Sequence, residues 1–283
     1  MKTIDTLVAD MKHVLTTGEG YTSEIRDWVA GDIAQSLDRQ LGTSGGFSEP
    51  RLRMSGLGTP CDRRLWYTIN RASDREPLPA NTKFKFLYGD LIESLTLGLA
   101  KAAGHSVTGL QGSVEIAGIR GSRDAIIDGV LIDVKSANDR SMQKFRDNGL
   151  RDGDPFGYLS QLSSYLFASQ DDDLLTEKNK AGFLVADKNF GHIELYMYDL
   201  TDLMENKLQE VENKKQLVKT KKPPPKAFDP VPDGKSGNMK LPTNCSYCDF
   251  KHICWPEART FLYSNGPRYL TKVEREPSAW EVK

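Results

Sequence analysis

The chain has 283 residues, of which 38% are hydrophobic and 27% are charged, as is usual for a soluble globular protein. Its 38 lysines and arginines nearly cancel its 39 aspartates and glutamates, so contact with nucleic acid would need positive charge that is gathered locally. No run approaches the roughly 18 apolar residues that span a bilayer, and the first residues lack the pattern of a secretory leader. We therefore expect a cytoplasmic protein that has no membrane partner.

Hydrophobic periodicity predicts a succession of helices and short strands. A proline run at 223–225 should end the last long helix, and a Pro/Gly-rich linker then leads to a cysteine-rich stretch at 245–254. The expected elements are, in chain order, a helical segment over 1–45, a helix over 83–103, β-type runs over 113–119, 122–127 and 130–135, a helix over 156–169, strands over 181–186 and 193–198, and a helix over 201–219.

The dipeptide Asp128-Gly129, between two apolar runs, predicts a two-residue hairpin turn. Counting outward from this turn places Asp124 opposite Asp133. Because side chains alternate along a strand, Asp133 and Lys135 share one face. The apolar residues of the second run, Val130, Ile132 and Val134, then take the other face and can enter the core.

Two carboxylates that face each other across a hairpin repel each other. A divalent cation between them removes that cost, and Mg²⁺ and Mn²⁺ favour oxygen ligands of this kind. A lysine beside the ion could orient or deprotonate a water molecule and offset the charge on a phosphate. The alternative is an exposed hairpin face with scattered charges, which an Asp-x-Lys sequence equally permits.

Gly121-x-x-Asp124, followed by the hairpin and Asp133-x-Lys135, resembles the core motif of the PD-(D/E)XK nucleases. Two further segments resemble the RecB-like branch of that family. Gly89-Asp-Leu-Ile-Glu93 lies on the preceding helix, and Gln161-x-x-x-Tyr165 lies on the helix that follows. Each motif is weak alone, but four in this order over roughly 75 residues are together much more specific.

The resemblance implies an α/β, restriction-endonuclease-like core, in which a mixed central sheet is flanked by helices. It also implies catalytic roles for Asp124, Asp133 and Lys135. Glu93 and the Val134 carbonyl would be additional metal ligands, and Gln161 and Tyr165 would contact DNA or support the site. Glu93 is a departure, since many RecB-like members have histidine there, and this puts the preferred metal in question.

The four cysteines are expected to be metal ligands, because disulfides are rare in a reducing compartment. Cys245-x2-Cys248-x5-Cys254 lies near the C-terminus and Cys61 lies far upstream. This arrangement resembles that of the iron–sulfur nucleases, such as the AddB subunit and the nucleases of CRISPR spacer acquisition. It implies a structural [4Fe–4S] cluster. A zinc site is the alternative, although structural zinc more often uses two Cys-x-x-Cys pairs.

Two basic groups are weaker candidates for DNA contact. Arg63 and Arg64 stand beside Trp66 and Tyr67, whose rings could stack on bases or instead pack beneath the cluster. Lys214 and Lys215 belong to a lysine-rich region that could track the phosphate backbone, or simply be a solvated helix end.

Together these features predict a magnesium- or manganese-dependent DNA exonuclease, of a stand-alone phage or prokaryotic type, that acts on single- or double-stranded ends. Its expected segments are a helical 1–80 that carries Cys61, a nuclease core over 81–222, and a linker and cluster-binding arm over 223–283. A homo-oligomer or a recombination partner protein would be compatible with this role. The alternatives are a non-catalytic DNA-end-binding protein that keeps the cluster, and a zinc-stabilised nuclease.

Overall fold

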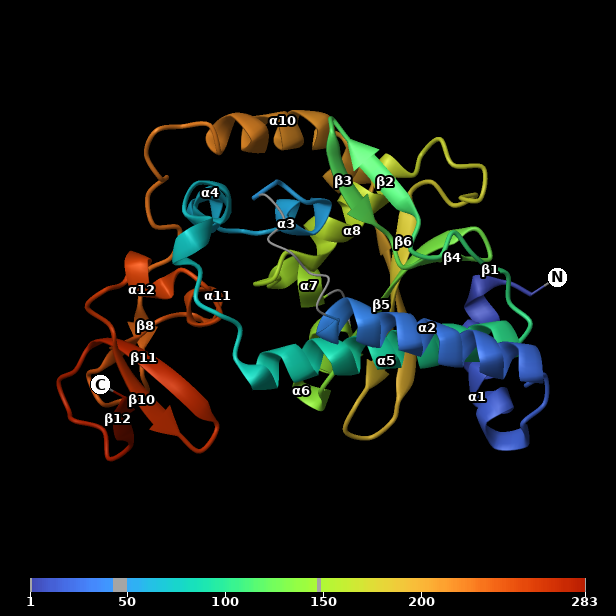
Figure 1. Cartoon of the computed structure of the whole chain (residues 1–283), viewed down its shortest axis with the longest axis horizontal. Coiled ribbons are helices and arrows are strands. Elements are labelled where there is room, and N and C mark those ends of the chain that lie inside the picture. Colours follow the sequence, from blue (N-terminus) through green and yellow to red (C-terminus); the bar gives the residue numbers. More distant parts are fainter. Residues whose placement is uncertain (1, 43–49, 147–148, 283) are drawn as a thin grey trace. The chain divides into compact units, whose positions relative to one another are not determined.

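A computed structural model describes residues 2–42, 50–146 and 149–282 (Figure 1). The chain divides into two compact units that do not follow the expected segments. Residues before 59 belong with the central sheet, whereas the segment that carries Cys61 belongs with the C-terminal region. Unit 1 comprises Met1–Gly58, Pro79–Asp154 and Tyr158–Glu212, and unit 2 comprises Thr59–Leu78, Pro155–Gly157 and Asn213–Lys283.

Unit 1 is built on a mixed sheet of five strands in the order β1-β4-β5-β6-β7. The pairing of β5 with β6 is parallel, and the other three pairings are antiparallel. The chain crosses between the two parallel strands through a run of helices, as parallel pairing requires. The strands are β1 (Val107–Thr108), β4 (Ala125–Ile127), β5 (Val130–Ala137), β6 (Lys180–Asp187) and β7 (Ile193–Asp199), which confirms a mixed α/β fold with a helix-flanked sheet.

Helices cover both faces of this sheet, so that each face has its own hydrophobic core. The residues of α1 (Leu7–Thr17) and α5 (Ala80–Ala102) pack on one face, and α2 (Ser23–Leu41) lies alongside α5 (Figure 1). The other face is covered by α3 (Met54–Leu57), α6 (Asp139–Phe145), α7 (Gly149–Asp152) and α8 (Tyr158–Ala168). Unit 1 also contains the 3-10 helix η1 (Ile4–Thr6) and α9 (Thr201–Met204), while α10 (Lys207–Leu217) runs from unit 1 into unit 2.

The β4–β5 hairpin has the predicted register. Ile127 pairs with Val130 and Ala125 pairs with Ile132, so Asp124 and Asp133 follow at the next step. Asp128 and Gly129 both have positive φ, 49° and 81°, as a type I′ turn requires. A Cβ on Gly129 would also lie 2.0 Å from Thr176 Oγ1, so glycine is needed there for space as well as for conformation.

The expected strand over 113–119 is wrong. It is instead a small hairpin of β2 (Ser113–Ile116) and β3 (Ile119–Ser122), which turns at Ala117-Gly118. Ala117 has a φ of 49°, a conformation that alanine rarely adopts, so its sequence gave little sign of a turn. The N-terminal helical segment is likewise broken, between α1 and α2, at Gly18 (φ 73°).

Unit 2 contains an antiparallel sheet that the sequence did not predict. Its strand order is β12-β10-β11-β9-β8, where only a linker and cysteine-rich arm were expected. The strands are β8 (Val231–Pro232), β9 (Met239–Lys240), β10 (Arg259–Tyr263), β11 (Gly266–Lys272) and β12 (Trp280–Val282), and the helices are α4 (Asp62–Asn70), η2 (Ala72–Asp74), α11 (Thr243–Ser246) and α12 (Lys251–Cys254). Among the described residues, no helix is both long and apolar enough to cross a membrane.

Candidate active site and cysteine pocket

The β4–β5 hairpin brings Asp124, Asp133 and Lys135 together in unit 1, as its register predicts. Asp133 is buried and forms an ion pair with the Lys135 ammonium. The Asp124 carboxylate accepts a hydrogen bond from the Val134 backbone N–H, at 2.8 Å. This bond ties the residue before β4 to the middle of β5, so Asp124 keeps a fixed place beside its neighbour on the opposite strand.

Glu93 approaches the same site from α5. Its carboxylate accepts a hydrogen bond of 2.6 Å from the Gln111 side-chain amide. Burial and the charge of Asp133 raise the pKa of Glu93 to about 7, even though the Gln111 hydrogen bond acts in the opposite direction. A raised pKa caused by neighbouring carboxylates is what crowded negative charge produces, and it is common at functional sites.

The other titrating groups report the same concentration of negative charge. Burial, and then the charges of Asp133 and Glu93, hold the pKa of Asp124 well above its ordinary value. Burial by itself would lower the pKa of Lys135, but the two aspartates outweigh it and raise that pKa instead. Lys135 therefore keeps its proton at neutral pH. It is suited to stabilising negative charge or orienting a water molecule, rather than to removing a proton.

The buried Asp133 Oδ2 is ion-paired with the Lys135 ammonium. A carboxylate oxygen of this kind can also bind a divalent cation. The donors fit such an ion, because Mg²⁺ and Mn²⁺ prefer carboxylate oxygens. Within the described chain, however, no three His, Cys, Asp or Glu side chains already form a group that could hold a metal ion.

Helix α8 supplies the two further predicted residues. Gln161 Nε2 donates to Tyr165 Oη at 3.4 Å, so the pair shares one helix face. Burial raises the pKa of Tyr165, which therefore remains a neutral donor. Gly121 allows the Tyr165 ring to lie close to β3, since a Cβ at this position would lie 2.8 Å from Tyr165 Cε1 and 2.5 Å from Met54 Cβ.

Three neighbours of the site had no predicted role. Gln111 holds Glu93 and has a left-handed φ of 48°. The Tyr158 ring lies 5.5 Å from Lys135 Nζ in a cation–π contact. The buried Arg123 donates to Ser169 and pairs with Asp172, which anchors the residue before Asp124. None of the three falls in a recognisable motif, and the unusual backbone of Gln111 cannot be read from its sequence.

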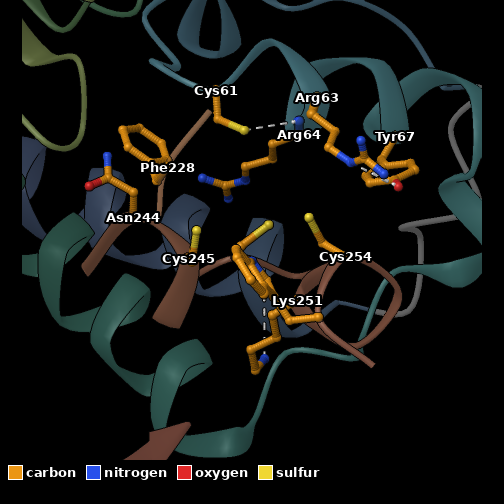
Figure 2. A pocket seen from close by; sticks show the side chains of 11 residues that line it. Cys61, Arg63, Arg64, Tyr67, Phe228, Asn244, Cys245, Lys251 and Cys254 are labelled. Carbon is orange, nitrogen blue, oxygen red and sulfur yellow. Dashed lines mark hydrogen bonds between the residues drawn. The ribbon is translucent and has the colours of Figure 1, made fainter. Parts of the chain in front are cut away.

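In unit 2, all four cysteines line one pocket, which has a volume of about 20 Å³ (Figure 2). Cys61 comes from the start of α4, where its sulfur accepts a hydrogen bond from the Arg64 N–H at 3.4 Å. Cys245 and Cys254 come from α11 and α12, with Cys248 between them. Figure 2 shows the sulfurs of Cys61, Cys245 and Cys254 pointing into the same space. The remote cysteine and the clustered three thus line one pocket, although among the described residues no three of them form a group that could hold a metal ion.

Burial acts on three of these thiols, and cationic side chains line the same pocket. Burial raises the pKa of Cys245 to about 11, and burial also raises the pKa values of Cys248 and Cys254. Coordination by a metal deprotonates such thiols. The side chains of Arg63, Arg64 and Lys251 line the same pocket and would offset the charge of four thiolates.

Trp255 also lines this pocket. Its indole Nε1–H is buried and, within the described residues, has no hydrogen-bond partner of good geometry. It lies close enough to Cys245 to lower the pKa of that thiol, against the larger effect of burial. A buried donor beside four thiols is suited to an anionic sulfur site.

The structure corrects the idea that Trp66 and Tyr67 could stack on bases. Both rings are buried with Phe250, next to Cys248 and Cys254, so the packing alternative holds. The Arg63 guanidinium donates to the Pro224 carbonyl at 2.7 Å, and Arg64 pairs with Asp249 at 3.1 Å. These arginines therefore support the pocket. Lys214 and Lys215 are half-buried near the end of α10, and both have interaction partners.

No protein-family model and no curated protein matches the chain. A solved structure described as "Crystal structure of SSO0001" resembles it at 17% sequence identity, over 81% of this chain and 96% of the other, with a TM-score of 0.42. A likeness of that size carries no argument about function.

Proposed function

We propose that this protein is a metal-dependent deoxyribonuclease of the PD-(D/E)XK class, with a restriction-endonuclease-like core. The observation that carries the proposal is the convergence of Glu93, Asp124 and Asp133 with Lys135, in a site where burial and neighbouring carboxylates raise the pKa values of Glu93 and Asp124. The order of these residues along the chain, and the elements that carry them, match the resemblance drawn from the sequence.

The residues have distinct roles in this proposal. Glu93, Asp124 and Asp133, with the Val134 carbonyl, would hold one or two Mg²⁺ or Mn²⁺ ions, which supply Lewis-acid stabilisation of the phosphate. The protonated Lys135 stabilises the negative charge that builds up on the phosphate oxygens. A water oxygen bonds to phosphorus and releases a proton to solvent, the bond to the leaving oxygen breaks, and that oxygen takes up a proton. Gln161 and Tyr165 would contact the DNA or support the site.

The proposed substrate is the end of a DNA strand, and the proposed reaction is exonucleolytic. The support for this comes from the RecB-like motifs on α5 and α8. A stand-alone role in phage or prokaryotic DNA processing, in the cytoplasm, follows from the same resemblance.

We also propose that unit 2 holds a structural [4Fe–4S] cluster on Cys61, Cys245, Cys248 and Cys254. Its support is the single pocket that all four thiols line, together with the buried Trp255 donor and the cationic lining. The cluster would join the segment around α4 to the C-terminal region.

A digestion assay tests the nuclease. Linear DNA labelled at either end is compared with closed circular DNA, in both single- and double-stranded forms, with Mg²⁺ or Mn²⁺ and cluster-loaded protein. Asp133→Ala and Lys135→Ala should abolish cutting, while Asp171→Ala, at an exposed carboxylate in the same unit, should not. Intact DNA in every arm would leave a DNA-end-binding protein as the remaining reading.

Metal analysis tests the cluster. Protein purified without oxygen should contain about four iron and four labile sulfide per chain, by the composition of the cluster. One equivalent of zinc without iron or sulfide would instead identify a zinc-stabilised nuclease.

A further inference from the structure

A cavity of about 380 Å³ adjoins the candidate active site in unit 1. Glu93 and Asp124 line it, so it adjoins carboxylates that would hold the catalytic metal ions. Its volume is at the lower end of the range for small-molecule sites, roughly 300–1,000 Å³. It is therefore large enough for one nucleoside beside the phosphate that those ions would bind.

The lining of the cavity is mixed, with apolar surface suited to a base and sugar. Helix α2 contributes Trp28 and Gly31, and Leu97 and Leu110 add apolar surface from α5 and the loop after β1. An ideal Cβ built on Gly31 meets no atom within 4 Å. The glycine therefore leaves open space within a helix, where this residue is otherwise unfavourable.

The charge of the cavity bears on which strand end can enter. Its lining includes the carboxylates of Asp27 and Asp32, in addition to Glu93 and Asp124, and one cationic side chain, Arg39. Asp27 is paired with Arg26 at 2.8 Å, whereas Asp32 accepts its hydrogen bond from the neutral Ser94 hydroxyl, at 2.6 Å. Asp32 thus places a carboxylate close to any group in the cavity, and a terminal phosphate would be repelled.

We propose that this cavity receives the terminal nucleoside of a DNA strand that ends in a free hydroxyl group, and that it discriminates against ends that carry a phosphate. This inference rests on the proposed nuclease function and adds the chemistry of the strand end to it. A cavity that holds one nucleoside also predicts release of one nucleotide at a time.

The experiment compares four duplexes that differ only at the labelled strand end, which is a 3′ hydroxyl, a 3′ phosphate, a 5′ hydroxyl or a 5′ phosphate. Wild-type protein with Mn²⁺ should digest a hydroxyl end at least about tenfold faster than the corresponding phosphate end, and its first products should be single nucleotides. Equal digestion of hydroxyl and phosphate ends, or first products of several nucleotides, would overturn the inference while leaving the nuclease intact. Failure to cut any DNA would instead remove the nuclease proposal on which it rests.

Two variants probe the cavity from opposite directions. Gly31→Leu should fill it and slow digestion at least about tenfold, while Ala30→Leu, an exposed neighbour outside the cavity on the same helix, should digest at the wild-type rate. Asp32→Asn should reduce the difference in digestion rate between hydroxyl ends and phosphate ends. The substitution removes charge but keeps an oxygen that can accept the hydrogen bond from Ser94. Unchanged digestion by Gly31→Leu, or unchanged discrimination by a folded Asp32→Asn protein, would contradict the proposal.

Discussion

The Asp124 carboxylate and the Val134 backbone N–H are joined by a hydrogen bond of 2.8 Å across the β4–β5 hairpin. The bond offsets part of the penalty of placing Asp124 beside Asp133, because an N–H donor stabilises the ionised form. It cannot remove that penalty, since burial and then the charges of Asp133 and Glu93 keep the pKa of Asp124 raised. Without a metal ion, the site therefore carries unfavourable electrostatic energy.

Removing one negative charge from this site should stabilise the metal-free protein while destroying its activity. Asp133→Asn leaves Lys135 with Glu93 and Asp124, so the thermal unfolding midpoint without divalent cations should rise. Cleavage should fall by about a thousandfold, because Lewis-acid stabilisation is worth several kcal/mol. Calorimetry with a digestion assay checks both effects. Asp171→Asn is the control, and a lower midpoint for Asp133→Asn would contradict the account of repulsion.

Stability should also depend on pH through Glu93. Its pKa is about 7, against an ordinary value of 4.5, so the folded state binds more protons than the unfolded state between these values. The contribution of Glu93 to stability is complete below pH 4.5 and declines as pH rises through about 7. Melting temperatures from pH 5 to 8 in a chelator should show this decline, and Glu93→Gln should reduce it. Saturating Mg²⁺ should weaken it as well, and an unchanged slope in Glu93→Gln would assign it to other groups.

Gly121 should be intolerant of even one added methyl group. Gly121→Ala places a Cβ within 2.8 Å of both Met54 and Tyr165 side-chain atoms, and overpacking of this kind typically costs about 1–3 kcal/mol. Denaturant unfolding should show that loss, and digestion should slow because Tyr165 must shift. Gly153→Ala, which meets no atom within 4 Å, should leave both unchanged. A neutral Gly121→Ala would mean that α8 moves aside easily.

Loss of one thiol should loosen unit 2 and spare unit 1. Structural metal sites contribute on the order of 10 kcal/mol, as much as the whole stability of an ordinary domain. Cys245→Ser should therefore release iron and open the chain to protease within Thr59–Leu78 and Asn213–Lys283. The check is limited proteolysis followed by mass spectrometry, with Tyr247→Phe as a control at an exposed neighbour. Cleavage spread equally over both units would contradict a local role for the thiols.

The parts of the fold that sequence predicted are those set by short-range rules. The Asp128-Gly129 turn fixes the register of β4 and β5, and with it the meeting of Asp124, Asp133 and Lys135, because only one pairing suits a two-residue turn. The apolar face of β5 follows from simple alternation. These inferences needed only the neighbouring residues.

The parts that were missed depend on distant partners or on unusual backbone. Ala117 turns at positive φ without a glycine's freedom. Two strands of the unit 2 sheet, Val231–Pro232 and Met239–Lys240, have only two residues each, which is too short for any alternation to show. Gln111 reaches Glu93 from 18 residues away in the sequence, through a loop with no motif.

The composition of unit 2 has a consequence for the order of events during synthesis. Cys61 and Cys245 line one pocket but are 184 residues apart in the sequence. Most of unit 1 lies between them in the sequence. At about 5–20 residues per second, the ribosome adds the second thiol roughly 10–40 seconds after the first. Cys61 therefore spends that interval without its partners, while the sheet of unit 1 can already form. The cysteine pocket is therefore completed after most of unit 1 has been synthesised, late in the maturation of the chain.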